Sequence, residues 1–143
     1  KTMKTRKVLI LVLLFSILLS ACNIAPTPEP VYVEDETEKA AILADSDVFI
    51  QNVINGIKDK DFATFSQDFD EAMLKATTPA SFDQLAAVYS TLGSPTSMEL
   101  KNIQDIGTYF AVRYTVKYPE KTINYRLVVD KNDPRKVSGL WFE

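Results

Sequence analysis

The spacing of apolar residues changes once along this chain, at Ser94 and Pro95. Before this point, apolar residues recur at intervals of three and four, which is typical of amphipathic helices. After it, apolar and polar residues alternate, which is typical of half-buried strands. A chain whose helices precede its strands is typical of an α+β domain. The sequence therefore predicts N-terminal helices that pack on an antiparallel sheet.

About three helices are expected before the change. The first spans residues 39–57, and the second segment, residues 62–74, forms one or two short helices with its phenylalanines facing the core. The third follows Thr78 and Pro79, a typical N-cap and first-turn pair, and runs to Gly93. Four strands are expected to follow as a meander, at residues 98–106, 109–118, 122–129 and 137–141.

The N-terminal region has the layout of a secretory signal peptide. Lys4, Arg6 and Lys7 precede an apolar run, residues 8–19, that is interrupted only by Ser16. A helix that crosses the hydrocarbon core needs about 20 apolar residues, so this run is short for a permanent span. Residues 1–21 are therefore predicted to be a cleaved signal peptide.

The residues at the predicted cleavage site resemble the bacterial lipobox, and they are Leu19, Ser20, Ala21 and Cys22. The thiol of Cys22 would carry a diacylglycerol through a thioether, and its freed amino group would accept a further acyl chain such as palmitate. Two or three chains anchor a protein stably, whereas one chain does not. We expect an extracytoplasmic lipoprotein held to a bacterial cell membrane. The alternative is an ordinary signal peptide with a chance cysteine.

A tether, residues 22–38, is predicted between the anchor and a single domain, residues 39–143. The tether contains three prolines and no basic residue, a composition that favours an extended spacer. Loss of residues 1–21 removes four of the 16 basic residues and none of the 19 acidic ones, which leaves a net charge of −7. Such a charge disfavours nucleic acid and anionic lipid headgroups as partners.

The amino-acid composition limits the catalytic and metal sites that the chain can form. No histidine is present, so the commonest general base and metal ligand is missing, and the one cysteine is assigned to the lipid. We therefore expect no catalytic set, no metal and no cofactor. The alternative is an isomerase or hydratase that pairs an aspartate base with a tyrosine donor, and Asp68, Asp70 and Asp105 are its candidate acids.

Several short phrases resemble the bacterial family called domain of unknown function 3887. They are Ile54-Asn55-Gly56, Lys60-Asp61-Phe62 with Phe65-Ser66, Phe69-Asp70 with Met73, Leu92-Gly93, and Val137-Ser138-Gly139-Leu140-Trp141. The resemblance covers about residues 40–143. It implies a cone of the cystatin-like or nuclear-transport-factor-2-like kind, in which a curved sheet wraps a helix and often leaves a cavity.

The aromatic residues expected at this cavity are Phe82, Tyr89, Tyr114, Tyr118, Tyr125 and Trp141. They would either line a pocket for a small apolar ligand or fill the core. The leading hypothesis is a non-enzymatic domain that binds a small ligand or an envelope protein, and a homodimer through the open sheet is a further alternative. Arg113, Lys117 and Arg126 would lie on the outer sheet face, where Glu99 and Glu120 are candidate partners.

Overall fold

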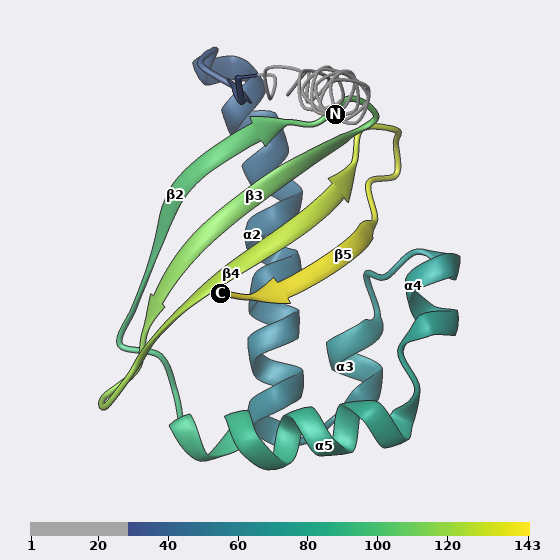
Figure 1. Ribbon diagram of the computed structural model, residues 1–143, viewed down its shortest axis with the longest axis vertical. Coiled ribbons are helices and arrows are strands. Elements are labelled where there is room, and N and C mark those ends of the chain that lie inside the picture. The colour runs from purple at the N-terminus through teal and green to yellow at the C-terminus, as the bar shows by residue number, and fades with distance from the viewer. Residues whose placement is uncertain (1–28) are drawn as a thin grey trace, which may run out of the picture.

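The computed structural model describes residues 29–143, in which one short strand precedes the helices and four strands follow them, all five in one antiparallel sheet. Each strand pairs with the next one along the chain, so the sheet order is β1-β2-β3-β4-β5 (Figure 1). The predicted α+β class is confirmed. The elements are β1 (Val31–Tyr32), α2 (Glu36–Asp59), α3 (Phe62–Ser66), α4 (Glu71–Ala76), α5 (Pro79–Tyr89), the short 3₁₀ helix η1 (Ser90–Leu92), β2 (Ser97–Asp105), β3 (Tyr109–Lys117), β4 (Thr122–Asp130) and β5 (Val137–Phe142).

The prediction of four strands is wrong, because β1 adds a fifth strand within the residues assigned to the tether. The two residues of β1 pair with Asp105 and Gln104 at the end of β2. The next residue, Val33, donates its backbone N–H to the carbonyl of Ile103 and is 6% exposed. A strand of two residues is too short to show an alternating pattern. The fold therefore begins near residue 31 rather than at residue 39.

Helix α2 also begins earlier than predicted. The carboxylate of Asp35 accepts a hydrogen bond from the backbone N–H of Glu38, which caps the helix, and the acidic Glu36 and Glu38 lie in its first turn. These acids stabilise the positive end of the helix dipole. Residues 36–38, which were predicted to belong to the tether, thus form the first turn of a 24-residue helix.

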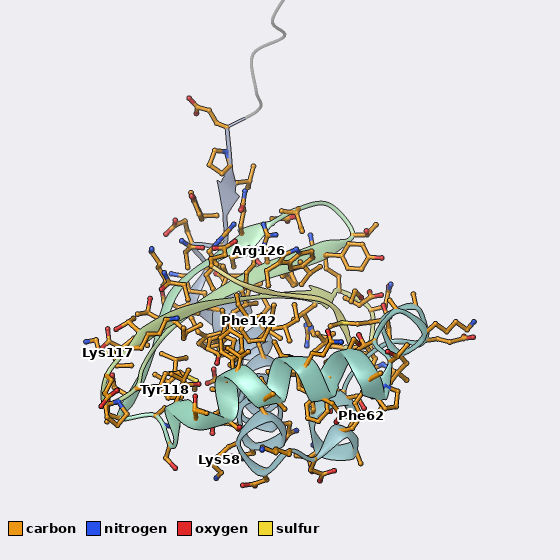
Figure 2. All side chains as sticks on the ribbon, turned by 60° about the horizontal axis from the view of Figure 1, so that its bottom comes forward. Lys58, Phe62, Lys117, Tyr118, Arg126 and Phe142 are labelled. Carbon is orange, nitrogen blue, oxygen red and sulfur yellow. The ribbon has the colours of Figure 1, made fainter. Side chains whose placement is uncertain are left out.

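The helices of residues 29–143 all lie on one side of the sheet. In Figure 1, α2 crosses behind the strands and α5 runs along one end of the sheet. The core lies between the inner sheet face and the helices, and its most buried members include Ile42, Ile50, Val53, Val112, Val116, Leu127 and Val129. The opposite sheet face carries no helix among the described residues, as the turned view shows (Figure 2).

Helices α2 and α3 meet at Gly56. A Cβ atom at this position would overlap the backbone of Phe65, so only glycine allows the approach. The chain turns between the helices at Lys60, whose φ of 55° is left-handed, and the N–H of Asp61 donates to the carbonyl of Gly56 at 2.8 Å. Gly56 therefore sets the spacing of the two helices.

A β-bulge in β5 reverses the direction in which its last residues point. Val129 pairs with Val137, but Val128 pairs with Gly139, so Ser138 is the extra residue. Val137 faces the core, whereas Trp141 lies opposite Arg126 on the outer face and is 44% exposed. Figure 2 shows Arg126 on the helix-free side of the sheet. The prediction that Trp141 faces the cavity is therefore wrong.

Replacement of Gly139 by alanine is expected to displace the indole of Trp141. A Cβ at Gly139 would occupy the place of the indole ring, over which the guanidinium of Arg126 lies at 4.3 Å from the centroid. Because the overlapping atoms are the far end of a side chain that is 44% exposed, we expect a loss of only about 0.5–1 kcal/mol. The single tryptophan reports the change as a shift in intrinsic fluorescence, and Ser138→Ala, which adds no atom under the ring, should leave the spectrum unchanged.

Candidate functional site

Most of the predicted aromatic residues fill the core. Phe82, Tyr114 and Tyr125 are each 1% exposed and Tyr118 is 8% exposed. The hydroxyls of Tyr118 and Tyr125 share a hydrogen bond of 2.8 Å. Of the two interpretations left open by the sequence, the packed core describes these four side chains.

A small apolar cleft lies beside Phe82, at the edge of this core. It has a volume of about 220 Å³ and is lined by Phe65, Met73, Thr77, Ser81, Phe82, Leu85, Leu140 and Phe142. Tyr89 borders this region, because its ring centroid lies 4.8 Å from that of Phe142. In Figure 2, Phe142 lies between the sheet and α5. Phe82 is therefore the predicted residue that lines this cleft.

Tyr114 makes the contact between a tyrosine and an aspartate that an isomerase-like site would need. Its hydroxyl donates to the carboxylate of Asp47 at 2.6 Å. Burial raises the pKa of Tyr114, and the hydrogen bond to Asp47 raises it further. Asp47 lies on the exposed side of α2, however, so the pair consists of a buried donor and a solvated acceptor. This geometry matches a structural hydrogen bond between helix and sheet.

Raised tyrosine pKa values predict a loss of stability in alkali. Burial raises the pKa of Tyr114, Tyr118 and Tyr125 in the folded state, whereas an unfolded tyrosine ionises near pH 10. The stabilisation is therefore complete below about pH 10 and is lost as the pH rises above it. Urea unfolding between pH 8 and 11 should show the loss. Tyr114→Phe should make the pH dependence shallower, whereas Tyr32→Phe, at an exposed side chain, should not.

The candidate acids have structural partners. Asp68 accepts a hydrogen bond from the side-chain amide of Asn52 at 2.8 Å. Asp70 caps α4 through the N–H of Met73 at 2.7 Å, as expected of a capping acid. Asp105 pairs with Lys131 at 2.7 Å, and this hydrogen bond lowers the pKa of Asp105. These contacts account for all three acids without a catalytic role.

A second cleft lies between the first turns of α2, the end of β1 and the middle of β2. Its volume is about 470 Å³, within the usual range of ligand sites. Its apolar lining includes Val33, Leu43 and Ile103, which belong to the core or pack against it, and Leu100, which is 39% exposed. The full lining is Tyr32, Val33, Glu34, Glu36, Lys39, Ala40, Leu43, Leu100, Lys101, Asn102 and Ile103. We call this the α2–β2 cleft.

Charged residues surround the opening of the α2–β2 cleft. The side chains of Glu34 and Glu36 are 84% and 86% exposed. The ammonium of Lys39 contacts both carboxylates, at 4.0 Å from Glu34 and 2.8 Å from Glu36. Lys101 is exposed on β2. The cleft thus has an apolar interior and a charged rim. This arrangement suits a ligand that carries both an apolar and a charged group.

Sequence reasoning missed the α2–β2 cleft. Its position depends on β1 and on a β-bulge in β2, where the pairing with β3 shifts between Leu100 and Asn102. One signal was present, since alternation in residues 98–106 is less regular than in the strands that follow. Irregular alternation with lysine at its centre is typical of a bulged edge strand.

The basic residues of the outer sheet face are paired with acids. Lys117 lies 3.3 Å from Glu99, as expected from the sequence. Arg113 and Arg126 lie 3.7 and 3.3 Å from Glu143, which takes the place expected for Glu120. The three cations therefore take part in cross-strand ion pairs.

The predicted lipidation site lies outside the described residues. Leu19, Ser20, Ala21 and Cys22 precede residue 29, so lipid attachment stays a prediction from the sequence. Among residues 29–143, no helix has both the length and the apolar character needed to cross a bilayer.

Comparison with known proteins gives no matching family model, no matching curated protein and no matching solved structure.

Proposed function

We propose that this protein is a bacterial cell-envelope lipoprotein, anchored outside the cytoplasm by lipid on Cys22, whose domain is a non-enzymatic binding module. The N-terminal sequence supports the anchor, because positive charge, apolar length and lipobox occur in the expected order. The resemblance to domain of unknown function 3887 supports a cone of the cystatin-like or nuclear-transport-factor-2-like kind.

The α2–β2 cleft is the observation that carries the binding role. Its volume of about 470 Å³ lies in the range of ligand sites, and its apolar floor and charged rim would bury an apolar group while orienting a polar one. The predicted tyrosine pocket is filled by its own side chains, so the cleft replaces it as the proposed site. The isomerase or hydratase alternative is less well supported, because the hydroxyl of Tyr114 is held by an exposed carboxylate.

Native mass spectrometry tests this proposal. The full chain, extracted in detergent from its own host, should carry a reproducible bound mass that Leu100→Arg removes. Val88→Arg is the matched control, because Val88 is 65% exposed on α5 and does not line the cleft. A bound mass that survives Leu100→Arg, or that Val88→Arg also removes, would contradict the assignment of the site.

A further inference from the structure

We propose that the occupant of the α2–β2 cleft is an extended peptide of a partner protein, which adds as a strand to the free edge of β2 with basic side chains toward Glu34 and Glu36. This inference rests on the proposed function of the cleft as a binding site.

The edge of β2 offers main-chain hydrogen bonds. On this edge, β1 contacts Asp105, Gln104 and Ile103, and the chain then turns away into α2. Residues 97–100 pair in unbroken register with β3 on their other side, and no described strand lies beside their free edge. Alternate residues of an edge strand point their N–H and C=O groups outward. The complementary ligand for such groups is another extended strand.

The cleft offers a place for the side chains of that strand. Alternate side chains of a strand point to the same face, so an added strand would direct every second residue toward the helix side. There, Leu43, Leu100 and Ile103 supply apolar surface. The bulge between Leu100 and Asn102 ends the regular register, so the added strand is expected to be short.

Charge complementarity selects a basic peptide. Glu34 and Glu36 line the cleft, and Asp35 and Glu38 are exposed beside them. The lining holds two lysines, Lys39 and Lys101, against four acids in residues 34–38, so this region stays acidic although Lys39 contacts Glu34 and Glu36. Lysine or arginine on the partner would meet these carboxylates, whereas an acidic peptide would be repelled.

Hydrogen exchange tests the proposal on the full chain in detergent. The probes are the hexapeptide Thr-Val-Thr-Val-Thr-Lys, whose two valines and lysine share one face, the same peptide with glutamate in place of lysine, and the lysine peptide with alternate peptide nitrogens methylated. The lysine peptide should slow exchange of the outward-facing amides among residues 97–100 by about tenfold, the effect of roughly one added hydrogen bond at each of them. The other two peptides should not, and Glu34→Gln combined with Glu36→Gln should weaken the protection.

Equal protection by the methylated peptide, or no protection at millimolar lysine peptide, would overturn this inference. A co-purifying small molecule lost on Leu100→Arg, together with no peptide effect, would leave the proposed function standing and remove the strand partner. If Leu100→Arg retained every bound mass and the peptides had no effect, both the proposed function of the cleft and its strand partner would be contradicted.

Discussion

Replacement of Cys22 by serine is expected to move the protein from the membrane fraction to the soluble fraction. Serine lacks the thiol that forms the thioether, so no diacylglycerol is attached. Each buried methylene contributes about 0.8 kcal/mol, so loss of two or three chains removes almost all membrane affinity. Intact-mass analysis of the detergent-extracted protein should show the lipid on the wild type and not on Cys22→Ser.

Ala21→Ser is the matched control for this experiment, because it keeps a small residue before the cysteine and should preserve lipidation. An unlipidated wild-type protein that still partitions with membranes would contradict the anchor. Such a result would direct attention to a retained apolar run at residues 8–19 instead.

Replacement of Gly56 by alanine is expected to lower the free energy of unfolding by about 2 kcal/mol. The new methyl group would overlap the backbone of Phe65, which cannot rotate away as a side chain could. Overpacking costs about 1–3 kcal/mol, and overlap with backbone atoms places this case near the upper limit. A loss of about 2 kcal/mol therefore remains after the gain of up to about 1 kcal/mol from the higher helix propensity of alanine.

Asn55→Ala provides the comparison, because it also raises helix propensity, by up to about 0.7 kcal/mol, at the neighbouring position without the overlap. Urea denaturation of both variants separates the two effects. If Gly56→Ala were as stable as Asn55→Ala, the close contact between α2 and α3 would not exist in solution.

The sequence predicts the parts of this fold that have a long, regular pattern. Strand β4 alternates throughout its nine residues and β3 alternates from Val112 onward, so their inner and outer faces could be assigned. Tyr114, Tyr118 and Tyr125 face the helices for this reason. The N-cap at Thr78 was also predicted from the sequence, and its hydroxyl accepts a hydrogen bond from the N–H of Ser81.

Features set by one or two residues could not be predicted. The bulge at Ser138 shifts Trp141 to the other face, and no period in a six-residue strand shows such an insertion. β1 has two residues and gains its place only by pairing with β2. The α2–β2 cleft depends on both β1 and the bulge beside Leu100. It could therefore be recognised only in the tertiary structure.

The most direct test of the central claim, that the α2–β2 cleft is the binding site, is photocrosslinking of the full chain in its own host. A benzoylphenylalanine at position 100 should give a discrete adduct, and the same group at position 88 on α5 should give none. Adducts at position 88 but not at position 100 would contradict the account.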